Sequence, residues 1–397
     1  MSRQDYGIIP LTTLEVERLR ARIMTKIHEV DTVLFVGAGA SVPFGYQTTD
    51  QFIEEIKRMR LTQPETRILK FYAETPGITI EDIIRALDIQ IKVGSNPILK
   101  REAVSPLRTI ELEGELAEAK NKLQNEEVTQ KLENQLDAYK TLKDRIISQL
   151  YIAYGDRPEL EKAWEVYADY IGILRERNDA VVPIFTTNYD KVIETLENIP
   201  DSEINHVIRG FKEQKDGVPR NPVWSPEEVL DQEPKRDRIL LFKLHGSLNW
   251  RIDIRNIIRE AEEGAFELRG FWKENVLIPP GTVDFQYGEP YQSLRTYLEG
   301  YLMQANTCVV IGYRFDDLTI RDVFLRSIKQ GLNLVILNPE AEKIKAQKFH
   351  QSENIVSIPK TIEEGVGDLR KVLIPSEAPS VTESEAEKTQ PPAPETS

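Results

Sequence analysis

Short apolar runs recur along the chain without the alternation that marks a half-exposed strand. They lie at 31–36, 181–185, 239–244, 308–311 and 332–337. Helical patterns follow three of these runs, at 49–60, 189–197 and 317–329. Strands that are buried on both faces read as continuous apolar runs, and strands that alternate with helices pair in parallel. The pattern predicts an α/β protein with a parallel, Rossmann-like sheet covered by helices on both faces.

Other segments carry different patterns. Residues 12–30 have the apolar spacing of an amphipathic helix that Thr12 or Thr13 can cap, with Glu15 close behind. Residues 206–235 are typical of a surface connection with little regular structure. For 251–275 we expect a helix followed by a short connector.

A mainly helical insert interrupts the strand–helix rhythm between residues 78 and 174. Its part from about 106 to 154 is rich in Glu, Lys, Leu and Gln, and its leucines recur at spacings of three and four. We interpret it as two amphipathic helices with a break near Asn125. The insert could serve as a local lid or as an oligomerisation surface, and the sequence favours neither.

The last residues, 375–397, form an acidic stretch of Pro, Ser, Glu, Thr and Ala with almost nothing to bury, which predicts a disordered tail. The expected organisation therefore has four parts. They are an N-terminal helix with the first strand–turn–helix (1–77), the helical insert (78–174), the remainder of the α/β domain (175–374) and the tail (375–397).

Composition narrows the possible functions. The net charge of −14 argues against a protein that coats nucleic acid or a membrane surface, since phosphate contacts need clustered cations. The single cysteine, Cys308, excludes an intrachain disulfide and a four-cysteine zinc site, and the four histidines form no metal-binding motif. No apolar run is long enough for a membrane span. We expect a cytoplasmic protein without a metal.

Polar or glycine-containing motifs follow each of the predicted strands. They are Gly37-Ala38-Gly39-Ala40-Ser41, Thr187-Asn188-Tyr189-Asp190, His245-Gly246, Gly312-Tyr313-Arg314 and Asn338. Ligands of parallel sheets bind outside the carboxyl ends of the strands, so these motifs should line one crevice. A glycine turn after a strand can approach a pyrophosphate, an asparagine amide can orient a ligand, and a histidine can act as a base near neutral pH.

Each motif also has an ordinary structural explanation. The glycine turn lacks the third glycine of a complete dinucleotide fingerprint and can be a sharp strand-to-helix turn. Asn188 and Asp190 are common residues at a helix start, a single histidine is more often structural than catalytic, and Asn338 precedes a proline. Five such motifs in order, each at a strand end, nevertheless indicate a ligand site.

As a set, these motifs resemble the NAD-binding signature of sirtuins, over about 31–338. The resemblance implies that NAD is bound and that Asn188 and His245 are the catalytic residues, placing water and acting on the ribose hydroxyls. It assigns the remaining motif residues to NAD binding: Gly37, Ala38, Gly39, Ser41, Thr187, Asp190, Gly312, Tyr313, Arg314 and Asn338.

The chain departs from protein-deacylating sirtuins, because it lacks their four-cysteine zinc module and their Phe-Gly-Glu stretch. It is similar to the sirtuin-like domains of bacterial antiphage systems, which hydrolyse NAD to ADP-ribose and nicotinamide and so halt phage growth. The resemblance implies an NAD hydrolase, a homo-oligomer, and a HerA-type ATPase or argonaute-like partner. A deacylase or ADP-ribosyltransferase, or a scaffold that binds NAD or ADP-ribose without cleavage, are the alternatives.

Overall fold

The computed structural model describes residues 12–75, 78, 80–95, 115–155, 160–178, 181–198, 206–212, 222–231, 233, 235, 238–261, 272–277, 288–350 and 352–374. The predicted acidic tail (375–397) and an internal part of the insert (96–114) lie outside these residues. The four-part division of the chain therefore stays a prediction.

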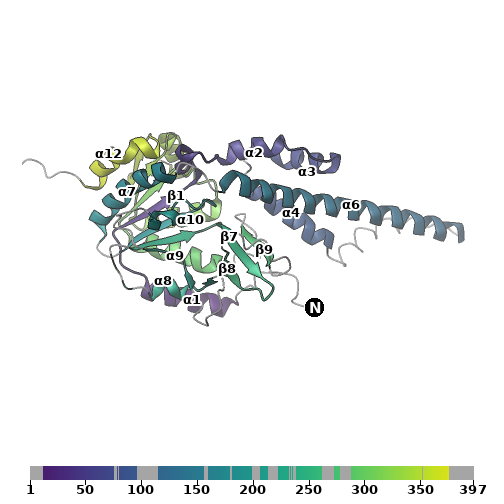
Figure 1. Cartoon of the computed structure of the whole chain (residues 1–397), viewed down its shortest axis with the longest axis horizontal. Helices are drawn as coiled ribbons and strands as arrows, with labels where there is room; N and C mark the ends of the chain where they lie inside the picture. The colour runs from purple at the N-terminus through teal and green to yellow at the C-terminus, as the bar shows by residue number, and fades with distance from the viewer. Residues whose placement is uncertain are drawn as a thin grey trace, which may run out of the picture.

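A seven-stranded parallel sheet forms the centre of the molecule, in the order β12-β11-β10-β1-β2-β6-β3 (Figure 1). Its strands are β1 (Thr32–Val36), β2 (Val182–Thr186), β3 (His206–Ile208), β6 (Arg238–Lys243), β10 (Thr307–Ile311), β11 (Asn333–Leu337) and β12 (Ile355–Ile358). The five predicted strands are confirmed, and β3 and β12 extend the sheet at its edges. The predicted α/β, Rossmann-like class is correct.

Strand β1 shows why the apolar runs are continuous. Leu34 and Val36 pack into the core on one face of the sheet, whereas Val33 and Phe35 pack into the core on the other. All four side chains are fully buried. Since both faces are covered, no position of the strand can be polar without a cost in desolvation.

Helices cover both faces. The first core contains residues of α2 (Thr49–Lys57), α3 (Gln63–Ala73), α4 (Ile80–Ser95), α6 (Glu115–Tyr154), α7 (Leu160–Arg177) and α12 (Ile362–Leu373). The second contains residues of α1 (Thr13–Lys26), α8 (Glu227–Leu230), α9 (Tyr291–Gln304), α10 (Leu318–Lys329) and α11 (Ala341–Phe349). Thr12 caps α1 in a capping box with Glu15, as predicted.

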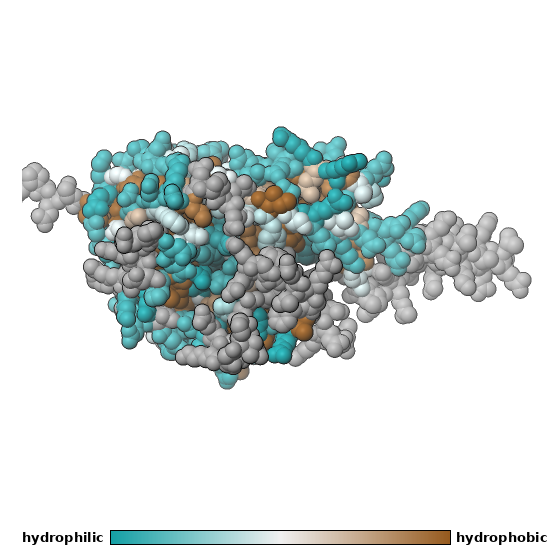
Figure 2. Space-filling view, in the orientation of Figure 1, coloured by the Kyte–Doolittle hydropathy of each residue, from teal (hydrophilic) through white to brown (hydrophobic). Residues whose placement is uncertain are grey.

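The helix α6 extends beyond the body of the molecule as an arm, with α3 and α4 packed along part of it (Figure 1). It runs without interruption through Asn125, so the predicted break there is wrong. Ion pairs tie it to its neighbours: Lys143 lies 2.5 Å from Asp88 of α4, and Arg145 lies 3.1 Å from Glu65 of α3. Hydrophilic residues dominate the face in Figure 2, and hydrophobic residues gather in smaller patches.

A second sheet of five antiparallel strands follows the order β4-β5-β8-β7-β9. Its strands are β4 (Phe211–Lys212), β5 (Val223–Trp224), β7 (Gly246–Asp253), β8 (Ile258–Glu260) and β9 (Trp272–Leu277). The helix predicted over 251–275 is therefore wrong, and 206–235 holds more regular structure than expected. Arg251, Asp253 and Arg259 are buried in this sheet, and Asp253 pairs with Arg259 at 2.8 Å.

The remaining elements are the short 3-10 helices η1 (Ala38–Ala40), η2 (Val42–Phe44) and η4 (Glu194–Asn198). The last of these stands where a longer helix was predicted at 189–197. None of the helices in the described part of the chain is long and apolar enough to cross a membrane.

Candidate functional site

The predicted motifs meet at one edge of the parallel sheet. Val36 of β1 pairs with Thr186 of β2 and Ile311 of β10, while Thr186 pairs with Lys243 of β6 and Ile311 with Leu337 of β11. Each motif therefore starts one or two residues beyond the same register line. The strand order reverses between β1 and β10, because the strands that follow β1 in sequence lie on one side of this point and those that follow β10 lie on the other. Ligands of open α/β sheets bind at such a point.

The glycine turn after β1 packs directly on the loop after β10. The Gly37 N–H donates to the Ile311 carbonyl and the Gly39 N–H to the Gly312 carbonyl, both at 2.9 Å. A Cβ atom on Gly39 would lie 2.8 Å from the Gly312 oxygen, and one on Gly312 would lie 2.2 Å from the Ala40 nitrogen. Gly312 also has a φ of +65°, which favours glycine. These glycines let two backbone segments touch.

Most amides of this turn are occupied by the fold itself. Besides those of Gly37 and Gly39, the N–H groups of Ala40 and Ser41 donate to the Gly37 and Ala38 carbonyls. Within the described residues, the Ala38 N–H meets no protein acceptor. The turn thus offers one amide to a phosphate rather than the several that its sequence suggested.

Asn188 is buried and fixed through its side-chain nitrogen. Its Nδ2 donates to the Gly37 carbonyl at 3.1 Å and to Ser41 Oγ at 3.0 Å, and its backbone N–H donates to Thr186 Oγ1. Its Oδ1 is buried and accepts no hydrogen bond from the described residues. A buried amide oxygen without a donor is costly, which marks it as an acceptor prepared for a ligand or water.

Ser41 connects the loops after β1 and β2. Its hydroxyl accepts from Asn188 and donates to Asp190 Oδ2 at 2.9 Å, while Asp190 Oδ1 accepts from the Val192 N–H. Burial raises the pKa of the Asp190 carboxyl above its ordinary value, and the charge of Lys243 opposes this effect. Asp190 therefore supports Asn188 through Ser41.

A buried ion pair fixes the loop after β2. The sequence analysis missed this pair. Lys243 is fully buried on β6, and its Nζ lies 2.6 Å from Glu194 Oε1. It also donates to the carbonyls of Tyr189 (3.3 Å) and Asp190. A lysine inside an apolar strand was the signal available, since such a residue is almost never fully buried unless it is paired.

His245 lies on the loop after β6, next to the loop that carries Asn188. The Leu244 N–H donates to the Thr186 carbonyl at 2.8 Å, and the rings of Tyr189 and His245 lie 6.4 Å apart. His245 Nε2 lies 3.3 Å from Asp317 Oδ2, and both side chains are buried. Asp317 is the N-cap of α10, and the sequence analysis did not assign it to the site.

The other predicted residues lie at the same edge with different partners. Thr187 donates its N–H to the Val36 carbonyl at 3.3 Å. Tyr313 is buried against Phe35, and the half-exposed Arg314 pairs with Asp50 at 2.9 Å. Asn338 Oδ1 accepts from the Glu340 N–H, which is the turn role considered above as its alternative.

No group of three or more His, Cys, Asp or Glu within the described residues is arranged to hold a metal ion. The site that remains combines a close glycine turn, a fixed amide with an unmatched oxygen, and an imidazole beside a carboxylate. Such a set can orient a polar ligand and move a proton.

Residues 182–358 match the SIR2-like domain family. The matched segment contains Asn188, His245 and Gly312. The glycine turn precedes the segment in sequence, but β1 lies between β10 and β2 and brings the turn into the same edge. No curated protein sequence matches the chain.

Solved sirtuin structures align over most of the chain at low similarity. A Sir2 complex with a p53 peptide and NAD+ has 11% identity and a TM-score of 0.38, covering 91% of this chain and 98% of its own. Sir2Tm bound to a propionylated peptide has 12% identity, a TM-score of 0.36 and the same two coverages. A Sir2 homolog–NAD complex has 14% identity and a TM-score of 0.36, covering 90% and 94%.

Proposed function

We propose that this chain is an NAD glycohydrolase that cleaves NAD with water to ADP-ribose, nicotinamide and a proton. The observation that carries the proposal is the side chain of Asn188. Its nitrogen is held by Gly37 and Ser41, and its buried Oδ1 has no donor within the described residues. The match of residues 182–358 to the SIR2-like domain family supports NAD as the ligand.

The chemistry needs little beyond orientation. Nicotinamide is a good leaving group because its ring nitrogen is cationic in NAD, and its departure leaves positive charge on the ribose. Asn188 Oδ1 would accept a hydrogen bond from the attacking water and place it against that ribose. Because Asn188 is neutral, it stays an acceptor at every pH at which the protein is folded.

His245 would take up a proton from a ribose hydroxyl or from the water. A histidine is suited to this role near neutral pH, and general-base catalysis typically contributes a factor of about 10²–10⁴. The glycine turn, with its Ala38 amide, would face the phosphates, and Arg314 would lie at the adenosine end. No step in this scheme requires a metal ion.

We further propose that the enzyme acts in the bacterial cytoplasm as the NAD-depleting effector of an antiphage system. An NAD hydrolase that is always active would poison its own cell, so its activity should be gated. Assembly into a homo-oligomer, or contact with a HerA-type ATPase or an argonaute-like protein, would supply such control. Direct contact with nucleic acid is not part of this proposal, given the net charge of −14.

The test is to incubate the purified full chain with NAD, alone and with the products of neighbouring genes, and to separate the products. Release of nicotinamide with equimolar ADP-ribose supports the proposal. Acetyl-ADP-ribose formed only with an acetylated peptide would indicate a deacylase instead. Calorimetric binding of NAD without nicotinamide release under any of these conditions would indicate a scaffold.

A further inference from the structure

The contact between His245 and Asp317 joins two loops that start far apart on the sheet. His245 follows β6 and Asp317 follows β10, and β1 and β2 lie between these strands. Three strand spacings separate the two starting points by about 14 Å. Nevertheless, Nε2 and Oδ2 lie 3.3 Å apart, and each side chain is only 8% exposed. The pair therefore spans the strand ends that carry the glycine turn and Asn188.

The second oxygen of Asp317 is committed to the helix. Oδ1 accepts from the backbone N–H groups of Thr319 at 2.8 Å and Ile320 at 3.2 Å. Burial works to raise the pKa of this carboxyl, but the hydrogen bond and charge of His245, together with the helix amides, bring it below its ordinary value. Asp317 is thus a carboxylate at neutral pH, and its Oδ2 can only accept.

We infer that Asp317 is a positioning residue that holds His245 in the tautomer protonated at Nε2, which makes Nδ1 the basic nitrogen of the site. An ionised carboxylate needs a donor opposite it, so the proton of a neutral imidazole must be on Nε2. This assignment of the tautomer does not depend on the proposed function. Its catalytic meaning rests on the proposed function, in which His245 is the base.

Ionisable groups on the neighbouring loop have described contacts of their own. Tyr189 presents its ring to His245 at 6.4 Å. Asp190, Glu194 and Lys243 form the buried cluster below the loop after β2, where the Lys243 cation bonds Glu194 and the Asp190 backbone carbonyl. Among the described residues, Asp317 directs a carboxylate oxygen at the ring, at 3.3 Å from Nε2.

The substitution Asp317→Asn separates the two roles of this residue. Asparagine is as good an N-cap as aspartate, so the helix start is preserved. To cap α10, the new side chain must direct its oxygen to the amides of Thr319 and Ile320. Its NH₂ group then faces Nε2 and requires a lone pair there. The variant should therefore reverse the His245 tautomer while keeping the fold.

Nuclear magnetic resonance of protein labelled with ¹⁵N-histidine measures the tautomer of His245 directly. The chain has four histidines, and a His245→Gln variant identifies the His245 signals. At alkaline pH, long-range ¹H–¹⁵N spectra should show the proton on Nε2 in the native protein and on Nδ1 in Asp317→Asn. Asp316→Asn is the matched control, because Asp316 pairs with Arg314 and Lys348 rather than with His245. It should keep the native tautomer.

Kinetics test the catalytic part. Asp317→Asn should lower kcat for nicotinamide release about tenfold or more with little change in KM, because Nδ1 then carries the proton and cannot act as the base while NAD contacts persist. A purely structural cap would leave kcat unchanged in this variant. If Asp317→Asn does not fold, Asp317→Ser, which also caps a helix but cannot reach the ring, should give a mixed tautomer and a smaller loss in kcat, because part of the imidazole keeps Nδ1 unprotonated.

The outcomes separate this inference from the proposed function. An Nδ1-protonated His245 in the native protein, or an unchanged tautomer in Asp317→Asn, would overturn the inference whatever the activity. The expected tautomers in a chain that never releases nicotinamide would sustain the role of Asp317 in positioning the ring but refute the proposed function.

Discussion

The two sides of the strand-end edge are held in different ways. On the side of β1 and β2, Asn188, Ser41 and Asp190 share a chain of hydrogen bonds, and Lys243 supports the loop from below. On the other side, the contact between His245 and Asp317 joins the loops after β6 and β10. The first side is fixed by a chain of buried hydrogen bonds and a buried ion pair, whereas the described contact across the second is that between an imidazole and a carboxylate.

This difference suggests a division of labour. The Asn188 side should behave as part of the core, so that changes in it cost stability as well as activity. Substitutions on the His245 side should change the free energy of unfolding little and should act mainly on proton transfer during catalysis. The free energy of unfolding of variants on the Asn188 side therefore tests this difference between the two sides.

The largest effect is expected for Lys243→Met. It removes the cation from a buried ion pair and leaves Glu194 uncompensated, which should lower the free energy of unfolding by about 3–5 kcal/mol. Urea denaturation measures this change. The double variant Lys243→Met with Glu194→Leu should recover part of the loss, because an apolar pair of similar volume avoids the buried charge. A single-variant loss below about 1 kcal/mol would contradict the account.

Gly312→Ala should follow in size. A Cβ there strains a backbone at φ +65° and overlaps the Ala40 nitrogen, which together should cost about 2–4 kcal/mol. Gly331→Ala is the control, since Gly331 has a φ of +110° but open space around it. Gly331→Ala should lower the free energy of unfolding by the backbone strain alone, about 1–2 kcal/mol. Equal losses in the two variants would mean that the close approach of the turn does not matter.

Ser41→Ala should have a smaller effect on stability, about 1–3 kcal/mol, because it leaves one donor of Asn188 and one acceptor of Asp190 unmatched in the core. Ser327→Ala removes a buried hydroxyl whose hydrogen bond within the described residues goes to the Val323 carbonyl, so it should cost less. Thermal unfolding compares the two. The comparison between the two sides of the site fails if Ser327→Ala is the more damaging change.

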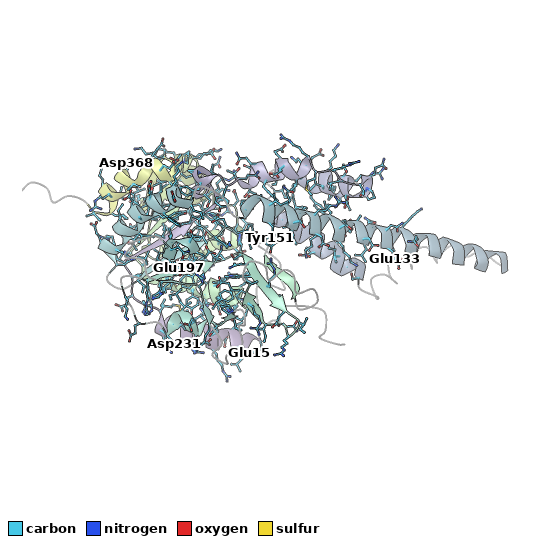
Figure 3. The ribbon with its side chains drawn as sticks, viewed as in Figure 1. Glu15, Glu133, Tyr151, Glu197, Asp231 and Asp368 are labelled. Atoms are coloured by element: carbon cyan, nitrogen blue, oxygen red, sulfur yellow. The ribbon has the colours of Figure 1, made fainter. Side chains whose placement is uncertain are left out.

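The central sheet was predictable because its strands are buried on both faces. Continuous apolar runs such as 308–311 predict both the strand and its burial. The second sheet was not, because its stability comes from pairs distant in sequence. Arg251 and Asp253 look like exposed residues in the sequence, but they are buried in β7, where Arg251 lies over the ring of Tyr151 at 4.9 Å. Figure 3 shows Tyr151 where α6 meets the body of the molecule.

The candidate site shows the same limit. The position of Asn188 and His245 at one edge followed from their place at the carboxyl ends of predicted parallel strands. The pairing of His245 with Asp317 did not, because it depends on how far the loop after β10 reaches across two strands. The sequence shows a lysine inside an apolar strand, which indicates that Lys243 needs a buried partner. It does not show which residue that is, because Glu194 lies 49 residues away and meets Lys243 only in the folded chain.

The most direct test of the account compares nicotinamide release from NAD by the native chain, Asn188→Ala and His245→Ala, with folding of each checked by thermal unfolding. The account predicts that both variants stay folded and lose nicotinamide release, while the native chain, with whatever partner activates it, releases nicotinamide and ADP-ribose together. Turnover at the native rate in either folded variant would contradict it.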